Sequence, residues 1–367
     1  MKITCFIDNL NAGGAQRQIC YLAYLLKRKK YIVTVLTYNS GNFFSEYLKN
    51  NKIKHVIIKD KNKFLRFVKI FRYFRTSKQD IIIAYLRNPS LIAEIASLFK
   101  KKWKLIVSER NNFKNDKNFS NFYRRIMHLF ADYVIVNSRS GYNSIRKNAP
   151  WLKKVSLIYN FTNLNYSKPK NKIHNTNKKT INFIGVGKYF DQKNILNLVR
   201  AFNIVKKKEP NINFFLHWFG DRYEKDQSNI YLNKIRSLVS FYNLNNRIFL
   251  NPATQDIKKK YKKSSVFILP SLYEGFPNVA CEALSCGLPV LISNVSDNKL
   301  FVDKTNGYMF DPNNSNDIAK KIILFCNLKN KERIAMSKNS RRKAVLFFNK
   351  KKFLNDYLKI IKKISNN

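Results

Sequence analysis

The stretch SVFILPSLYEGFPNVACEALSCGLPVLIS, residues 265–293, contains a complete strand–turn–helix–strand unit. The run VFIL is short and apolar, which is typical of a buried strand, and a turn at Gly275 and Pro277 follows it. A helix is expected over 279–285, because Cys286-Gly287 is a stop signal, and LPVLIS is the next strand. Two strands joined by a helix predict a parallel sheet.

The same alternation runs through both halves of the chain. In the first half we expect strands at 3–7, 31–38, KHVIIK, DIIIAYL, KLIVSE and DYVIVNS, and helices at 15–28, 61–75, 91–99 and 124–130. In the second half we expect strands at INFIGVG, NFFLHWFG, RIFL, SVFILPS and LPVLIS, with helices near 195–206 and after Phe276. Strands alternating with helices predict α/β domains whose parallel sheets are covered on both faces.

A polar, basic stretch without periodicity, 163–179, separates the two alternations. The expected organisation is therefore an N-terminal α/β domain at 1–165, a linker at 166–179, a second α/β domain at 180–345 and a C-terminal amphipathic helix at 346–367. The helical pattern itself begins near Lys343 and runs to Ser365. Its expected apolar face consists of Phe348, Phe353, Tyr357 and Ile361.

Composition narrows the classes of protein. The chain has 367 residues, which favours two domains, and 45% of them are hydrophobic, which is enough for real cores. The net charge of +48 favours a polyanionic partner: nucleic acid, an anionic membrane leaflet or a phosphorylated substrate. Part of this excess of positive charge also fits a composition rich in Lys, Asn and Ile.

The five cysteines form neither a C-x-x-C pair nor a His-rich cluster, so a reduced cytosol is expected, without disulfides or zinc. No signal peptide or membrane span is expected.

Three loops follow strands, where ligands of open α/β sheets bind. The first, Asn9 to Gly14, ends in two glycines before a helix, which suits an anion or a plain turn. The second, GVGKYFDQKN at 185–194, carries Lys188 and Lys193, which fit a diphosphate or are simply solvated.

The third loop holds two carboxylates, Glu274 in the turn and Glu282 one turn into the following helix. An ionised carboxylate accepts hydrogen bonds from hydroxyls, and a helix N-terminus binds anions. Together they suit a ligand with hydroxyls and phosphates, such as a nucleotide sugar. The alternative is that Glu274 caps the helix and Glu282 lies on the surface.

In these motifs the chain resembles the retaining glycosyltransferases of family 4, which have the GT-B architecture of two facing Rossmann-like domains and a C-terminal helix crossing back to the first. The matching motifs are Glu274-Gly-Phe-Pro-Asn-Val-Ala-Cys-Glu282, ALSCGLPVLIS, GGAQR, GKYFDQKN and KTNGYMF. The likeness is strongest to the bacterial enzymes that build lipid-linked glycans, capsule or O-antigen.

The resemblance implies a role for each matching position. Glu282 would bind the ribose and Glu274 the transferred sugar. Lys188 and Lys193 would hold the diphosphate, and Gly13 and Gly14 would close on the donor from the other domain. The implied donor-binding set is Gly13, Gly14, Lys188, Lys193, Glu274, Gly275, Phe276, Pro277, Asn278 and Glu282, of which Glu274, Lys188 and Lys193 would be catalytic.

The sequence departs from the family at several positions. Lys188 stands where the family usually has Arg, and Gln16-Arg17 follows the glycines where Glu-Arg is common. SERNN replaces the acceptor-side loop that often carries a histidine. We assign Glu109, Arg110 and Asn111 to the acceptor-side wall, with an acceptor phosphate as an alternative ligand of Arg110.

The leaving group would be a nucleoside diphosphate, whose growing charge the lysines and the helix N-terminus would stabilise. No Asp-x-Asp motif lies in a plausible loop, so we expect no metal and no cofactor beyond the nucleotide sugar. Retention of configuration follows from the resemblance. The expected donor is a UDP-linked hexose or N-acetylhexosamine, and the expected acceptor is polyprenyl-linked or a glycan.

The segment 61–78 holds seven basic residues and no acidic one. A helix here would place Phe64, Phe67, Val68 and Phe71 on one face, and this pattern fits either packing on the sheet or an interfacial helix on anionic lipid. The expected membrane-facing residues are Lys61, Lys63, Arg66, Lys69, Arg72 and Arg75. The enzyme would then be cytoplasmic and peripheral on the inner face of the cell membrane.

Two other classes remain open. A nucleotide-sugar epimerase can have the same architecture. A basic nucleic-acid-binding protein would explain the charge, but the sequence lacks the signatures of RNP strands, zinc fingers and helix-turn-helix motifs, so no nucleic acid is expected.

Overall fold

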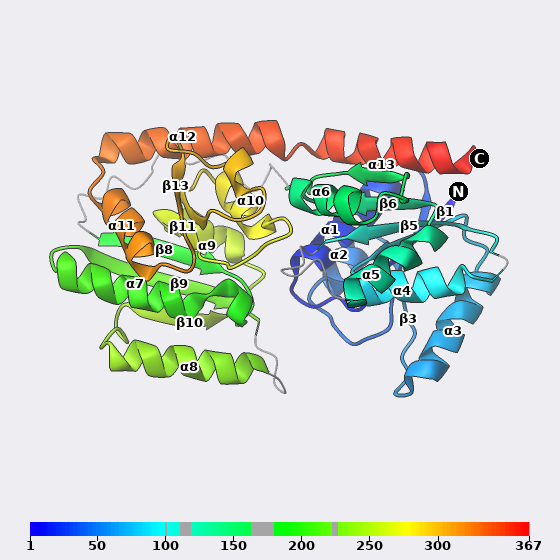
Figure 1. The fold of residues 1–367 in the computed structure, drawn as a ribbon, viewed down its shortest axis with the longest axis horizontal. Helices are drawn as coiled ribbons and strands as arrows, with labels where there is room; N and C mark the ends of the chain where they lie inside the picture. Colours follow the sequence, from blue (N-terminus) through cyan, green and yellow to red (C-terminus); the bar gives the residue numbers. More distant parts are fainter. Residues whose placement is uncertain (100, 111–118, 163–179, 222–226, 367) are drawn as a thin grey trace. The chain divides into compact units, whose positions relative to one another are not determined.

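The computed structural model of the chain describes residues 1–99, 101–110, 119–162, 180–221 and 227–366 (Figure 1). The chain divides into two compact units. Unit 1 comprises Met1–Asn160 and Lys350–Asn367, and unit 2 comprises Phe161–Asn349. Each unit is built on one parallel sheet with helices on both faces, as the alternating pattern predicts. Most of the expected linker, 166–179, lies outside the described residues.

The sheet of unit 1 has the strand order β3-β2-β1-β4-β5-β6-β7, and every neighbouring pair is parallel. Its strands are β1 (Lys2–Phe6), β2 (Ile32–Thr37), β3 (Lys54–Ile57), β4 (Ile81–Tyr85), β5 (Lys104–Glu109), β6 (Tyr133–Val136) and β7 (Val155–Leu157). Its helices are α1 (Gly14–Arg28), α2 (Ser45–Asn50), α3 (Lys63–Thr76), α4 (Arg87–Ala96), α5 (Phe119–Met127), the 3₁₀ turn η1 (His128–Phe130), α6 (Arg139–Asn148) and α13 (Lys350–Ser365).

The sheet of unit 2 has the order β10-β9-β8-β11-β12-β13 and is also parallel throughout. Its strands are β8 (Thr180–Val186), β9 (Asn213–Gly220), β10 (Ile248–Pro252), β11 (Val266–Leu269), β12 (Val290–Ser293) and β13 (Gly307–Phe310). Its helices are η3 (Asp191–Lys193), α7 (Ile195–Lys208), α8 (Gln227–Phe241), α9 (Ile257–Lys263), α10 (Asn278–Ser285), η4 (Asn298–Leu300), α11 (Ser315–Cys326) and α12 (Asn330–Phe347).

Both sheets have a topological switch point. In each sheet the first three strands follow one another toward one edge, and the fourth strand pairs with the other side of the first. This reversal lies between β1 and β4 in unit 1 and between β8 and β11 in unit 2. Ligands of open α/β sheets bind beyond the carboxyl ends of the strands at such a point. The loops after β8 and β11 are the second and third loops of the sequence analysis.

The apolar residues fill the space between sheets and helices. In unit 1 one face of the sheet packs on α3, α4 and α6 around Phe6, Phe74 and Trp103, with ring centroids 5.5 Å apart for Phe6–Phe74 and 5.8 Å for Phe74–Trp103. In unit 2 Phe183 of β8 packs on Phe202 of α7 and on a ring of α11. Within the described ranges, no helix is both long and apolar enough for a membrane span.

The C-terminal segment differs from the expected single helix over 346–367. The structure has two helices, α12 and α13, which are separated at Phe348 and Asn349. Phe348 is buried in unit 2, whereas Phe353 and Tyr357 are buried in unit 1. Because these side chains belong to two different cores, the helix is interrupted between them. The return of the chain to unit 1 through α13 is as predicted.

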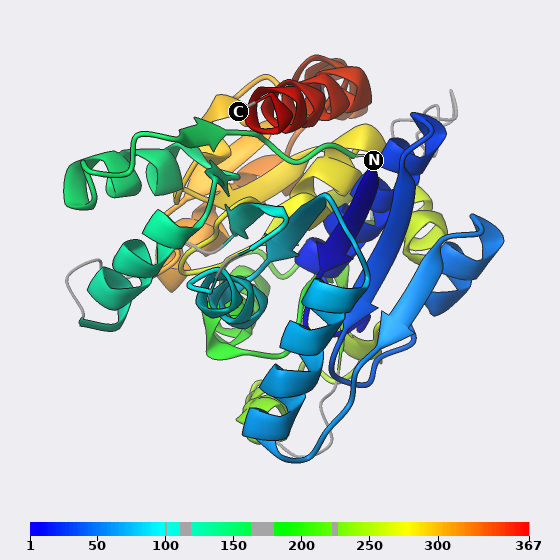
Figure 2. The same cartoon turned by 90° about the vertical axis from the view of Figure 1, so that its right-hand side faces the viewer.

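The buried face of α3 also differs from the expected one. Ile70 and Phe74 are the buried side chains, whereas Phe64 is 71% exposed and Val68 is 40% exposed. Phe74, in the second half of the helix, packs on Phe6 of β1 and on Trp103, the residue before β5, so the first turns of α3 extend beyond the sheet (Figure 2). Of the expected face Phe64, Phe67, Val68 and Phe71, Phe71 packs against the core and Phe67 stacks on Phe71, whereas Phe64 and Val68 are exposed. The expected packing face is therefore wrong only in its first turns.

Candidate active site

Two loops of unit 2 meet at its switch point. Lys193, at the end of the loop after β8, lies with its Nζ 2.5 Å from Oε1 of Glu274, in the loop after β11. Gln192 also joins the two loops. Its side-chain Nε2 donates to the carbonyl of Tyr273, and its backbone carbonyl accepts from the N–H of Leu272. The structure thus brings together the predicted lysine and the predicted turn carboxylate.

The loop after β8 turns into α7 through Asn194, whose φ of 54° is left-handed. This conformation is accessible to Asn at low cost, and the side chain donates to the carbonyls of Pro270 (3.1 Å) and Pro312 (2.7 Å). Asn194 therefore fixes the loop against the strand ends of β11 and β13. Lys188 lies half-buried in the same loop.

Gly185 of the GVG motif and Gly220 at the end of β9 allow close packing around the loop after β8. A Cβ on Gly185 would lie 2.2 Å from the Trp218 ring, and one on Gly220 would lie 2.2 Å from the carbonyl oxygen of Gly187. Trp218 in turn donates from Nε1 to that carbonyl at 2.8 Å. These glycines let β8, β9 and the loop approach closely, which is a structural reason for the motif beside any contact with a ligand.

The donor turn, which we define as residues 274–278, leads into α10 with Pro277 as its N-cap. The N–H of Asn278 donates to the carbonyl of Phe276 at 3.0 Å, so this amide is used within the turn. Ser296, from the loop after β12, donates to the carbonyl of Gly275 at 3.2 Å. The turn is therefore held from outside as well as from within.

Both carboxylates of the Glu-x7-Glu motif are buried. Glu274 is 7% exposed and Glu282, one turn into α10, is 3% exposed. The surface position considered for Glu282 is therefore wrong. Burial of a carboxylate is unfavourable unless the charge has a partner. For Glu274 that partner is Lys193.

An aromatic cluster lies beside the donor turn, and the sequence analysis did not anticipate it. Phe276, Phe301 and Phe348 pack with all three ring centroids within 6.0 Å of one another. The residues are far apart in sequence and follow no common period, so no local pattern could have grouped them.

In unit 1, the glycine loop lies after β1 at the switch point. Gly13 is the N-cap of α1, with an extended φ of −168°, and Gly14 is the first residue of the helix. Gln16, where the family usually has Glu, donates from Nε2 to Asp8 at 3.2 Å and is buried. The two glycines are thus at a helix N-terminus, as the sequence predicts.

Glu109, the last residue of β5, belongs to a buried cluster of charges. Its Oε1 lies 2.8 Å from Nε of Arg124 and 3.0 Å from Nε2 of His128, and Nδ1 of His128 lies 2.5 Å from Glu94. Burial would raise the pKa of Glu109, but Arg124 and His128 lower it to about 2. Burial would lower the pKa of His128, but the two carboxylates raise it to about 9. Sequence analysis missed Glu94 and His128, because only the fold brings α4 and η1 to the end of β5.

Arg110 is also buried, at 6% exposure. Its Cζ lies 3.6 Å from the centroid of the Tyr85 ring. Its guanidinium donates to Ser108 (3.2 Å), Asn160 (2.5 Å) and the hydroxyl of Tyr357 (3.3 Å). These contacts join β4, α13 and the end of unit 1, so a structural role accompanies the predicted acceptor-side one. Asn111 lies outside the described residues.

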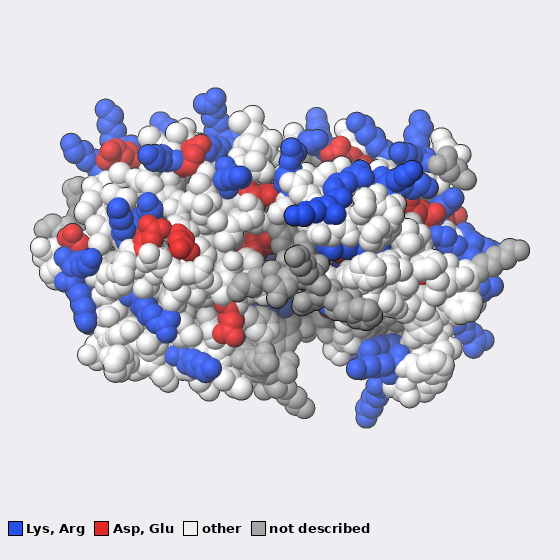
Figure 3. Space-filling model, in the orientation of Figure 1, with Lys and Arg blue, Asp and Glu red and all other residues white. Residues whose placement is uncertain are grey.

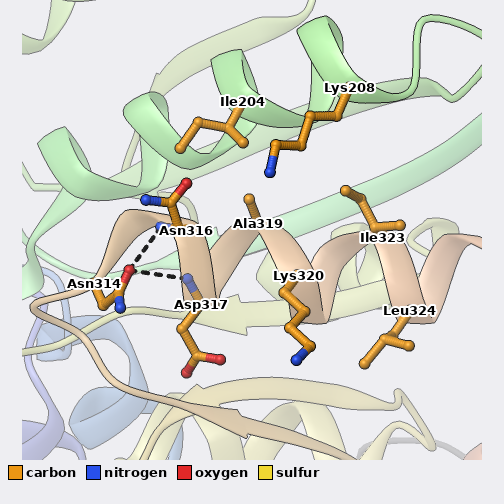
Figure 4. Close-up of a pocket in the computed structure, with 9 residues that line it drawn as sticks. All are labelled: Ile204, Lys208, Asn314, Asn316, Asp317, Ala319, Lys320, Ile323 and Leu324. Carbon is orange, nitrogen blue, oxygen red and sulfur yellow. Dashed lines mark hydrogen bonds between the residues drawn. The ribbon is translucent and has the colours of Figure 1, made fainter.

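A groove of about 450 Å³ lies between α7 and α11 (Figure 4). The residues that line it are Ile204, Lys208, Asn314, Asn316, Asp317, Ala319, Lys320, Ile323 and Leu324. None of these belongs to the two loops at the switch point, so the groove is separate from the candidate site. Among the described residues, no group of three or more His, Cys, Asp or Glu is arranged to hold a metal ion.

Comparisons with known proteins place the chain in a family. Residues 167–343 match the model "Glycosyl transferases group 1", and residues 12–166 match "Glycosyltransferase Family 4". The chain is 24% identical over 386 residues to an N-acetylgalactosamine-N,N'-diacetylbacillosaminyl-diphospho-undecaprenol 4-alpha-N-acetylgalactosaminyltransferase of Campylobacter jejuni, which covers 98% of this chain and 99% of the relative.

A second Campylobacter jejuni protein, a GalNAc-alpha-(1->4)-GalNAc-alpha-(1->3)-diNAcBac-PP-undecaprenol alpha-1,4-N-acetyl-D-galactosaminyltransferase, is 24% identical and covers 100% of this chain and 99% of its own. In fold the chain is similar to Anabaena Alr3699/HepE, solved with UDP and glucose, at a TM-score of 0.85 and 18% identity over 99% of both chains. The two family models cover the chain almost from end to end. It therefore belongs to the family 4 glycosyltransferases and is a glycosyltransferase with the GT-B fold.

Proposed function

We propose that the chain is a retaining, metal-independent enzyme that transfers a hexose or N-acetylhexosamine from a UDP-sugar to a polyprenyl-linked or polysaccharide acceptor in bacterial surface glycan synthesis. The observation that carries the donor half is the meeting of Lys193 and Glu274 at the switch point of unit 2. A cation for phosphates and a carboxylate for hydroxyls lie side by side there, as a nucleotide sugar requires.

UDP as the nucleotide is supported by the similar fold of Anabaena Alr3699/HepE, which has been solved with UDP and glucose. The lipid-linked acceptor is supported by the names of the two Campylobacter jejuni relatives, both of which act on undecaprenyl diphosphate-linked glycans. Unit 2 would then bind the donor, and unit 1 would carry the acceptor side with Glu109 and Arg110.

In the proposed mechanism, the bond between the anomeric carbon and the diphosphate breaks, and negative charge grows on the leaving diphosphate. The acceptor oxygen forms the new bond to the anomeric carbon and gives up its proton to the leaving diphosphate. Lys188, Lys193 and the N-terminal end of α10 stabilise that charge. Glu274 orients the transferred sugar through its hydroxyls, and Glu282 binds the ribose. Cations and helix dipoles lower the barrier without a divalent ion, which is the reason for proposing metal independence.

The proposal extends to an anionic membrane surface on the cytoplasmic side, where a polyprenyl-linked acceptor is held. Three apolar side chains on the first turns of α3 are exposed: Phe64, Leu65 and Val68. Basic side chains flank them, of which Lys61, Lys63, Lys69, Arg72 and Arg75 are exposed. On the face of the molecule in Figure 3, Lys and Arg cover more of the surface than Asp and Glu do. Exposed apolar groups beside cations suit the interface of an anionic bilayer.

A thermal-shift panel of UDP-, GDP- and ADP-sugars tests the donor half. We expect a UDP-sugar to raise the melting temperature of the wild-type chain, and Glu282→Ala to abolish that shift. If Glu282→Ala left the shift intact, the donor site would be wrong. Incubation with the donor alone tests the epimerase alternative, which has no observation in its favour, because accumulation of an epimer would support it.

A further inference from the structure

Phe348 is one of the three rings of the aromatic cluster at the donor turn. Its ring centroid lies 5.8 Å from that of Phe276 and 5.6 Å from that of Phe301, and the Phe276–Phe301 distance is 6.0 Å. The Phe348 and Phe301 side chains are each 1% exposed, and Phe276 is 7% exposed. Phe276 is the middle of the donor turn, with Glu274 two residues before it and α10 two residues after it.

Phe348 also lies at the end of unit 2. It follows α12, its N–H donates to the carbonyl of Ala344 at 3.0 Å, and the chain enters unit 1 two residues later at Lys350. The break between α12 and α13 therefore begins at a side chain that packs on the donor turn. If the helix were interrupted at another residue of this segment, the interruption would not lie next to Phe276 of the donor turn.

Helix α12, which ends just before Phe348, is firmly attached within unit 2. Asn339 donates to the carbonyl of Thr305 at 3.0 Å, and Nζ of Lys343 lies 2.5 Å from Oδ2 of Asp303. Arg341 donates to the carbonyl of Ser285 at the end of α10. α12 is thus bound to the end of α10 and to the loop before β13, which fixes the position of Phe348 within unit 2.

On the other side of the connection, α13 is attached within unit 1. The hydroxyl of Tyr357 lies 2.6 Å from that of Tyr85, and Arg110 donates to it at 3.3 Å. Phe353, one turn earlier, is 2% exposed, and its ring centroid is 4.9 Å from that of Tyr357. The chain on both sides of the non-helical connection, Phe348 and Asn349, is therefore anchored, α12 within unit 2 and α13 within unit 1.

We propose that Phe348 is a positioning residue for the donor site. Its ring holds Phe276 in place, and thereby also the carboxylate and the amides of the donor turn. Through this contact, binding of a ligand at the donor turn changes the chain connection at 348–350. This inference rests on the proposed function, because it takes the donor turn to bind a nucleoside diphosphate. It differs from a purely structural role in that binding of the nucleotide changes the backbone at the connection.

Two measurements on the full chain test it, with UDP as the probe. The first is the dissociation constant of UDP by calorimetry. The second is hydrogen exchange of the peptides that span residues 344–356, with and without saturating UDP. Phe348→Ala is compared with the conservative Phe348→Leu, with Phe347→Ala, and with Phe325→Ala. Phe347 is 44% exposed, and Phe325 is fully buried against Phe183 of β8, so they control for position and for core loss.

In the wild type and in Phe347→Ala we expect UDP to slow exchange of the 344–356 peptides. In Phe348→Ala we expect the effect to vanish even at saturating UDP, with a UDP dissociation constant raised about 10-fold, and we expect Phe348→Leu to recover most of both. Phe325→Ala lowers the melting temperature but leaves the UDP dissociation constant within about twofold. Wild-type chain that binds UDP without any change at 344–356 would overturn the inference alone, whereas wild-type chain that fails to bind UDP would overturn the proposed donor as well.

Discussion

Lys193 and Glu274 form a largely buried ion pair, 2.5 Å from Nζ to Oε1, that joins the two loops at the switch point of unit 2. The residues are 81 positions apart in the sequence. Their side chains are only 15% and 9% exposed, so the pair is better shielded from solvent than a surface salt bridge. A donor diphosphate and a donor sugar would each compete for one partner of this pair.

Removal of the Lys193 cation should weaken binding of the diphosphate. A charge-assisted hydrogen bond contributes about 1.5–3 kcal/mol, so we expect Lys193→Ala to raise the dissociation constant of UDP roughly 10- to 100-fold. Calorimetry with UDP and with uridine checks this. The uridine affinity should not change, because uridine has no phosphate, and Lys262→Ala, at an exposed position of α9, is the control. Equal losses for UDP and uridine would instead indicate damage to the whole site.

Neutralisation of Glu274 should separate turnover from nucleotide binding. We expect Glu274→Gln to lower kcat about 10-fold or more, because the transferred sugar loses a charged hydrogen-bond acceptor. UDP should bind at least as tightly as to the wild type, because Lys193 no longer has a competing carboxylate. Steady-state kinetics with the UDP-sugar identified by thermal shift, together with calorimetry of UDP, give both values. A parallel loss of kcat and UDP affinity would contradict the assignment of Glu274 to the sugar.

A methyl group at Gly185 should destabilise unit 2. The added Cβ would lie 2.2 Å from the Trp218 ring, which is fully buried and cannot move away freely. Overpacking of this kind costs about 1–3 kcal/mol of unfolding free energy, which urea denaturation would measure for Gly185→Ala. Gly13→Ala is the matched control. The atoms nearest to its Cβ belong to the end of the Gln16 side chain, which is hydrogen-bonded to Asp8 but adjusts more readily than a buried ring, so the loss should be smaller.

The buried cluster around His128 should make stability depend on pH. The pKa of His128 is raised from 6.5 to about 9, so its contribution is fully present below pH 6.5 and is lost as the pH rises through about 9. The pKa of Glu109 is lowered from 4.5 to about 2, so its contribution is present above pH 4.5 and is lost as the pH falls toward 2. Both contributions are complete between about pH 4.5 and 6.5.

Urea titrations at pH 6 and pH 9 check this dependence. We expect wild-type unfolding free energy to fall by roughly 3 kcal/mol from the His128 contribution over this range, at about 1.4 kcal/mol per unit of pKa shift. His128→Gln should be less stable at pH 6 and should lose much less on going to pH 9. His217→Gln is the control, because burial lowers the pKa of His217, so it does not titrate above pH 6.5. An alkaline loss unchanged in His128→Gln would contradict the role of the cluster.

Exposed apolar groups of α3 should direct the chain to anionic bilayers. We expect the double substitution Phe64→Ser with Val68→Ser to reduce sedimentation with anionic vesicles at least fivefold, since burial of each large apolar side chain contributes about 1.5–3 kcal/mol. Phe241→Ser, at a 77% exposed position of α8, is the matched control and should bind as the wild type does. Equal wild-type binding to neutral and anionic vesicles, or none to either, would contradict the proposal.

Local sequence determined much of this protein. Strand and helix types follow from side-chain period, as in the alternation of β8, α7 and β9, because each element must bury an apolar face on its own period. Motif spacing placed Lys193 and Glu274 in two loops of one domain and Glu282 in the helix that follows the second loop. It also placed Gly13 and Gly14 at the N-terminus of α1. These features depend on residues within a few positions of one another.

Only the tertiary structure decided the rest, because the contacts involved join residues far apart in the chain. The face of α3 that packs is set by Phe6 and Trp103, which no helical period reveals. The helix break at Phe348 arises because neighbouring apolar side chains belong to two cores. The charges of Glu109 and His128 depend on Glu94 and Arg124, which the fold brings to the end of β5. Free energies of burial and pairing act between elements, so the sequence alone predicts which groups are present but not which of them meet.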